Sequence, residues 1–188
     1  MQRFEDQTHS KVDFNQNALD MGLYEHCSFV DCTFVDADIS ELKFAECTFT
    51  NCDFTGARIA DVAFREVKFE RCKLLGLPFE DCDHFLLSLH FEECILDLVS
   101  FRDLPLKHAQ FIQCSLKETD FTGADLSSAT IQDCNLERAI FEHTNLEKAD
   151  LRGSTNLILD PEQNRIKNAQ FSLGSLPGLL KRFQIKVD

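Results

Sequence analysis

Residues 27–56 read CSFVD CTFVD ADISE LKFAE CTFTN CDFTG, and each block of five has a large apolar residue in third place. The same five-residue period continues through Ile59, Phe64, Phe69, Leu74 and Phe79. After a slip of two residues it resumes at Leu86 and Phe91 and runs on to Leu151. A helix returns its apolar face every three or four residues and a strand every two, so neither explains a period of five.

A second period of 20 residues lies over the first. Six of the nine cysteines are spaced by 20, 20, 22, 20 and 20 residues: Cys32, Cys52, Cys72, Cys94, Cys114 and Cys134. All nine stand two positions before the large apolar residue, provided that Cys82 belongs to the register upstream of the slip. Four blocks therefore make one coil, and stacked coils pair like parallel strands about 4.8 Å apart.

These periods predict an all-β, four-sided solenoid whose interior is built of columns of like side chains. About 25 blocks give about six coils and a rod about 30 Å long at strand spacing. Two columns of rings are expected, one of Phe29, Phe49, Phe69, Phe91 and Phe111 and one of Phe79, Phe101, Phe121 and Phe141. Each block is too short to bury its own apolar residue, so stability should come from contacts between coils.

The blocks resemble those of the pentapeptide-repeat family. Ala37-Asp38-Ile39-Ser40 and Cys52-Asp53-Phe54-Thr55-Gly56 carry the family pattern, as do residues 119–123 and 124–128. The resemblance implies a right-handed quadrilateral β-helix that binds partners and catalyses nothing. We assign residues 25–159 to the solenoid, residues 1–24 to an N-terminal cap or degenerate first coil, and residues 160–188 to a C-terminal cap and dimerisation tail.

The tail departs from the repeat. Ser175 is expected to cap a short helix with Pro177 in its first turn, and residues 184–188 alternate as a short strand. This layout resembles the C-terminal module through which the quinolone-resistance (Qnr-like) branch forms homodimers. The implied dimer interface consists of Leu176, Leu179, Leu180, Phe183, Ile185 and Val187. The alternative is a helix that folds back as a monomeric cap.

No motif for catalysis, for a cofactor or for a metal is present. The sequence lacks a phosphate-binding glycine loop, an HExxH helix and a nucleophile elbow. The six histidines do not pair at ligand spacing, and a linear column of cysteines does not converge as a zinc site requires. The cysteines are therefore expected to be buried, reduced and structural. We expect no enzyme and no metal or cofactor site.

Charge is the main functional signal. The net charge is −13, and residues 1–159 alone carry −15. Because the inward positions are apolar, this charge must coat the outside, where it repels nucleic acid and attracts basic clefts. The Qnr-like resemblance implies a DNA mimic that binds DNA gyrase or topoisomerase IV. A rigid scaffold for a partner unrelated to DNA is the alternative, since solenoids also need charge for solubility.

The slip in register predicts a bulge at residues 83–88. Asp83, His84 and Phe85 are a candidate partner-binding site, with Phe85 either at its tip or folded over the wall. The bulge is too short to match the projecting loops that matter for drug protection in the Qnr-like branch. No apolar run could span a membrane, no signal-peptide pattern begins the chain, and nine thiols suit a reducing compartment, so we expect a cytoplasmic protein.

Overall fold

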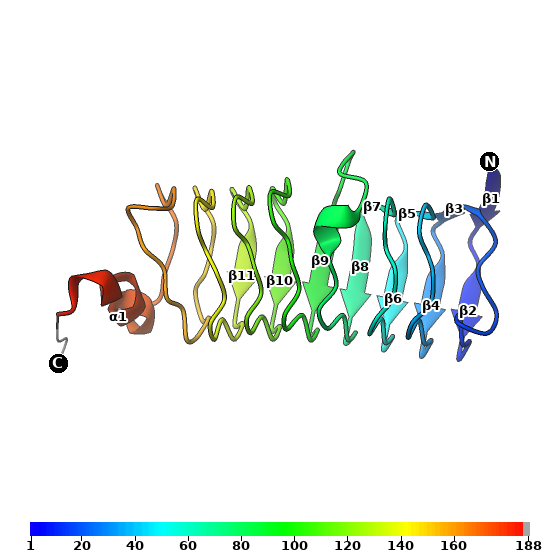
Figure 1. Cartoon of the computed structure of the whole chain (residues 1–188), viewed down its shortest axis with the longest axis horizontal. Coiled ribbons are helices and arrows are strands. Elements are labelled where there is room, and N and C mark those ends of the chain that lie inside the picture. The colour runs from blue at the N-terminus through cyan, green and yellow to red at the C-terminus, as the bar shows by residue number, and fades with distance from the viewer. Residues whose placement is uncertain (186–188) are drawn as a thin grey trace.

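The computed structural model describes residues 1–185 as an elongated stack of coils, with residues 1 and 185 at opposite ends of the stack (Figure 1). All strand pairs in this range are parallel. The strands are β1 (Gln2–Glu5), β2 (Thr8–Ser10), β3 (Gly22–Glu25), β4 (Ser28–Val30), β5 (Lys43–Ala45), β6 (Thr48–Thr50), β7 (Ala63–Arg65), β8 (Val67–Glu70), β9 (Leu89–Glu92), β10 (Gln110–Ile112) and β11 (Thr130–Gln132). The predicted β-solenoid is confirmed.

Within residues 1–185, helical structure is confined to short segments at the slip and in the tail. The 3₁₀ turn η1 (Phe79–Asp81) precedes the slip. The tail contains the 3₁₀ turn η2 (Leu173–Ser175), the helix α1 (Leu176–Leu179) and the 3₁₀ turn η3 (Lys181–Phe183). The repeat itself is therefore built of strands and turns.

Two of the four walls are sheets. The first wall has the order β1-β3-β5-β7, and the second has the order β11-β10-β9-β8-β6-β4-β2. The third and fourth walls are joined by single bridges, such as Thr33 with Asp53 and Asp38 with Arg58. Nearly every pair joins residues 20 apart, while β8 and β9 pair at 22. The register predicted from the cysteines therefore holds on both sides of the slip.

The interior consists of stacked aromatic rings. The rings of Phe29, Phe49, Phe69, Phe91 and Phe111 stack with centroids 4.6, 5.1, 5.2 and 5.2 Å apart. The rings of Phe79, Phe101, Phe121 and Phe141 form a second stack, with centroids 5.0, 5.4 and 5.2 Å apart. Rings of neighbouring columns meet edge to face, for example Phe101 and Phe111 at 5.6 Å. Both predicted columns are confirmed, and their stacked and edge-on contacts are the geometries that aromatic pairs favour.

Most corners contain a residue with positive φ, two positions after the large apolar residue. Asp31, Glu41 and Leu98, with φ of 54°, 63° and 63°, are examples. The left-handed conformation costs an L-residue roughly 1–2 kcal/mol, and β-branched residues tolerate it least. No Val, Ile or Thr occupies these positions within residues 1–185. The corners thus exclude β-branched residues from these outward positions.

The six cysteines of the 20-residue column, from Cys32 to Cys134, donate to backbone carbonyls at one corner. The Cys72 thiol accepts a hydrogen bond from the Cys52 amide at 3.4 Å and donates to the Phe49 carbonyl at 3.3 Å. One coil beyond Cys134, Ser154 takes the same place, accepting from the Cys134 amide and donating to the Ile131 carbonyl. All nine cysteines are buried and unbridged. Their spacing therefore reflects a buried backbone that needs a small side chain able both to accept and to donate.

The stack extends further at both ends than the regular blocks. The ring of Phe4 in β1 stacks on that of Tyr24 in β3, with centroids 4.6 Å apart, and the ring of His9 stacks on that of Phe29 with centroids 4.9 Å apart. Residues 2–21 therefore form a coil. At the other end, Asp150 still bridges Gln170. Ile166 and Phe171 pack against the core there.

At the slip in register, the structure differs in part from the sequence-based prediction. Cys82 is buried in the upstream register, as expected. Leu86 is 64% exposed with positive φ, so the prediction that it points inward is wrong. Leu87 packs against the core instead. The two extra residues before Leu89 form an outward bulge. As a result, the leucine that packs against the core is Leu87, one position later than the sequence pattern predicts.

The hydrogen bonds of the cysteine column predict how Cys72 responds to substitution. Cys72→Ala leaves the Cys52 amide without its thiol acceptor and removes a donor to the Phe49 carbonyl, so it should cost about 1–3 kcal/mol in the free energy of unfolding. Cys72→Ser keeps both bonds, as Ser154 does, and should cost clearly less. Urea denaturation of both variants measures the difference, and equal losses would show that the hydrogen bonds do not matter.

The stacked rings predict the effect of a cavity. Phe111→Ala removes a fully buried ring that contacts stacked and edge-on neighbours, so it should cost about 3–5 kcal/mol. Ile112→Ala, on the outward position next to it, is the control and should change stability by about 0.5 kcal/mol or less. A loss under about 1 kcal/mol for Phe111→Ala would contradict the packing described here.

Candidate interaction surfaces

An uncompensated row of carboxylates follows one edge of the rod. It lies at the corner where the chain enters the first wall, and we call it the acidic corner: Glu41, Asp61, Asp81 and Asp103. Successive members come from successive coils, and all four are exposed. Within residues 1–185, none of them lies within 4.0 Å of a basic nitrogen, whereas many other acids of the chain form ion pairs. The acidic corner is therefore free to attract cations of a partner.

The bulge of residues 84–88 interrupts the first wall next to this corner, and it projects from the stack beside β7 (Figure 1). Asp83 bridges Ala63 and accepts a hydrogen bond from the Phe85 amide at 2.9 Å. The Phe85 side chain is 64% exposed, and the Arg65 guanidinium carbon lies 5.5 Å from its ring centre. Of the two sequence-based alternatives for Phe85, the structure shows the exposed one. Asp83 is half-buried and His84 is exposed.

A groove of about 410 Å³ opens beside the bulge. Its lining combines apolar, basic and acidic groups: Ala45, Glu46, Arg65, Glu66, Leu86, Leu87 and Ser88. The apolar side chains Phe85 and Leu86 are both 64% exposed, and Arg65, Glu46 and Glu66 line the groove beside them. Aromatic anchors beside a charged rim are typical of protein-interaction sites.

The tail forms a short helical cap from η2, α1 and η3. The expected Ser175 cap is wrong, because Ser175 is already in the helical region, with φ −85° and ψ −13°, and makes no side-chain capping bond. Gln184 and Ile185 lie in no strand. The remainder of the predicted strand, Val187 included, lies outside the described residues.

The predicted apolar face of this helix is divided between two roles. Leu179 is buried on the end of the core, and Leu180 is half-buried. Leu176, Phe183 and Ile185 are 42%, 53% and 57% exposed. The tail thus buries Leu179 on the solenoid end and presents Leu176, Phe183 and Ile185 to the outside.

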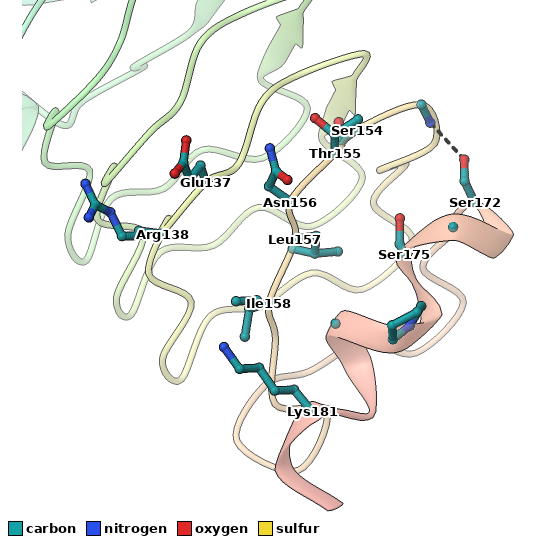
Figure 2. A pocket seen from close by; sticks show the side chains of 14 residues that line it. Glu137, Arg138, Ser154, Thr155, Asn156, Leu157, Ile158, Ser172, Ser175 and Lys181 are labelled. Carbon is teal, nitrogen blue, oxygen red and sulfur yellow. Dashed lines mark hydrogen bonds between the residues drawn. The ribbon is translucent and has the colours of Figure 1, made fainter. Parts of the chain in front are cut away.

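A cavity of about 680 Å³ separates the cap from the last coils (Figure 2). Ser154, Asn156 and Leu157 line it from the solenoid, and Ser172, Ser175 and Lys181 line it from the tail. At its inner edge the tail touches the wall closely: a Cβ atom on Gly178 would lie 1.7 Å from the Leu157 carbonyl oxygen. Glycine at 178 therefore lets the cap sit directly on the extended segment 157–159.

Two of the interior thiols, Cys47 and Cys82, are poor nucleophiles. Burial raises the pKa of Cys47 to about 12 and also raises the pKa of Cys82. A thiolate is the reactive form of cysteine, so groups with raised pKa values and no solvent access are poor nucleophiles. The geometry of the cysteine columns thus supports the structural role that their spacing predicts.

The sequence profile described as "Pentapeptide repeat region" matches residues 7–79 and 62–141. The chain belongs to the pentapeptide-repeat family. No curated protein sequence matches it. Among the described residues, no helix has the length and apolar character that crossing a membrane demands.

Solved structures of two other proteins share the fold. A trypsin-treated variant of QnrB1, a plasmid-mediated fluoroquinolone resistance protein, is similar with a TM-score of 0.66 and 17% identity, covering 100% of both chains. A second trypsin-treated QnrB1 variant is similar with a TM-score of 0.64 and 18% sequence identity, covering 100% of this chain and 92% of the other. HetL is involved in heterocyst differentiation regulation in the cyanobacterium Nostoc sp. strain PCC 7120. Its structure is similar with a TM-score of 0.51 and 18% sequence identity, covering 89% of this chain and 86% of HetL. At these identities the similarity establishes the pentapeptide-repeat fold alone.

Proposed function

We propose that this pentapeptide-repeat protein is a non-enzymatic, rod-shaped partner of a DNA-binding protein and acts by mimicking DNA. The observation that carries the proposal is the acidic corner, a row of four exposed carboxylates without ion-pair partners among the described residues. Rows of negative charge along a rod are what a DNA-binding cleft recognises in the phosphate backbone. The net charge of −13 adds long-range attraction to such a cleft and opposes direct binding of nucleic acid.

We propose a type II topoisomerase, DNA gyrase or topoisomerase IV, as the partner. This choice is supported by the similarity to QnrB1 over the whole length of both chains and by the helical C-terminal cap. A cytoplasmic location is part of the same proposal, since these enzymes act there. The bulge around Phe85 would add an apolar contact next to the charged corner. An effect on quinolone susceptibility follows only if the partner is the drug target.

A homodimer through the tail would place a second acidic row on the same long rod. Leu176 and Phe183 are exposed in the helical cap at the C-terminal end of the rod. A two-fold pairing places the same patch on both subunits and covers both sets of apolar side chains. It would also roughly double the length of the charged rod.

A scaffold for a partner unrelated to DNA is the second candidate. HetL shares the fold and is named for a role in differentiation, so the fold by itself selects no partner. A scaffold would use the apolar bulge, whose neighbours include Arg65, and would depend little on the acidic corner.

The first test neutralises the acidic corner. Glu41→Gln with Asp61→Asn, Asp81→Asn and Asp103→Asn should weaken binding to purified gyrase by about tenfold, because each surface charge contributes about 0.2–1 kcal/mol. The matched control removes four ion-paired carboxylates: Glu92→Gln, Glu118→Gln, Glu147→Gln and Glu162→Gln. Both variants have the same net charge, so they differ in where carboxylates are removed and in whether those carboxylates are ion-paired.

Competition with DNA separates the two candidates. Surface plasmon resonance with wild-type protein should show binding that added duplex DNA displaces and that 0.5 M salt abolishes through screening. Equal losses of gyrase binding in the two variants would show that only net charge matters and would contradict DNA mimicry by the acidic corner. No binding to either topoisomerase, with a different protein captured equally at high salt, would favour the scaffold.

The dimer is tested independently. Light scattering should give about 43 kDa for the wild type, twice the chain mass of 21.5 kDa. Leu176→Asp with Phe183→Asp charges the exposed part of the cap, spares buried Leu179, and should give about half that mass. Ile95→Asp with Leu98→Asp, at two other exposed apolar positions, is the control and should remain dimeric. A wild type that scatters as a monomer at micromolar concentration would exclude the dimer.

A further inference from the structure

Three metal-ligand side chains meet at the other edge of the first wall. His26 occupies the corner between β3 and β4, and Glu46 occupies the same corner one coil later. Both residues have φ of 52°, so their side chains leave equivalent corner positions. Glu25, the last residue of β3, points outward beside His26 because the preceding Tyr24 points into the core.

The spacing of these side chains suits a metal ion. The His26 Nδ1 atom lies 3.5 Å from the Glu46 Oε2 atom, and single ligand atoms of Glu25, His26 and Glu46 all lie within 4.8 Å of one another. Two ligands bound tetrahedrally at 2.0–2.2 Å stand about 3.4 Å apart. Among residues 1–185 this is the one group of three or more His, Cys, Asp or Glu side chains that converges in this way.

We propose that Glu25, His26 and Glu46 form a surface site for a divalent transition-metal ion, with Zn²⁺ as the reference ligand. One imidazole and two carboxylates favour Zn²⁺, Co²⁺ or Ni²⁺ over Mg²⁺ and Ca²⁺, which prefer all-oxygen sites. Three protein ligands leave a coordination position open for water or for a group of a partner. The ion would link two successive coils near the N-terminal end.

The surroundings support the site. Asp6 and Glu66 occupy the same corner one coil before and one coil after, so the local potential is negative. Arg3 contacts one oxygen of Glu25 and also approaches Glu5, which fixes the Glu25 side chain. A carboxylate has a second oxygen, so Glu25 can keep Arg3 and still bind the ion. The site shares no residue with the acidic corner, which lies on the opposite edge of the wall, although Glu46 also lines the groove beside the bulge.

The experiment is a calorimetric titration of the reduced full-length protein with ZnCl₂. We expect one ion per chain, and His26→Asn or Glu46→Gln should weaken binding by at least about tenfold. Asparagine tolerates positive φ, so His26→Asn should keep the corner intact. The matched control is His143→Asn, at an exposed corner with φ of 55°, which should bind like the wild type.

Co²⁺ absorption identifies the ligands. Binding at Glu25, His26 and Glu46 should give weak visible bands without the intense near-ultraviolet transition of a cobalt–thiolate bond. A thiolate transition would place the ion on cysteines and overturn the proposal. Absence of saturable Zn²⁺ binding, or equal binding by the wild type and His26→Asn, would overturn it as well.

Discussion

The parallel pairing of each coil with the next is the constraint on which the rest of this structure depends. The sheet walls donate and accept hydrogen bonds at a separation of 20 residues, so residue n must lie beside residue n+20. A one-residue error would turn the apolar side chains outward, which fixes the register strongly. The same constraint builds the interior columns of rings and the exterior rows of charge. The core and the candidate binding surface therefore follow from one repeat.

The corners show how little freedom the repeat leaves. Most corners need a residue that accepts positive φ, and just inside one of them lies a small side chain that pairs with buried amide and carbonyl groups. Cys72 meets the second need through its thiol, and Ser154 meets it through its hydroxyl. The outward positions are less restricted, so a binding surface can vary mainly there. Asp61 and Asp103 both have φ of 56°, a conformation that Asp accepts more readily than most residues, so the backbone favours Asp at these corners without requiring a carboxylate.

The periods of five and 20 were sufficient to predict the walls, the cysteine columns and the ring columns, because each follows from stacking alone. The slip was not predictable in detail, since Leu86 and Leu87 both satisfy the apolar pattern and only packing selects Leu87. The Ser175 cap failed because the tail enters a 3₁₀ turn before α1 begins. The site at His26 and Glu46 could have been found, since the two residues are 20 apart, but spacing between histidines alone does not reveal it.

The bulge explains how a solenoid with so regular a core can still be selective. Every coil repeats nearly the same backbone, so an uninterrupted rod offers a partner many equivalent positions along its length. Residues 84–88 break this equivalence once, a few residues after Asp81 of the acidic corner. A partner that binds both the charged row and the exposed Phe85 has a single register on the rod. Charge then supplies attraction and rate, while the bulge supplies position.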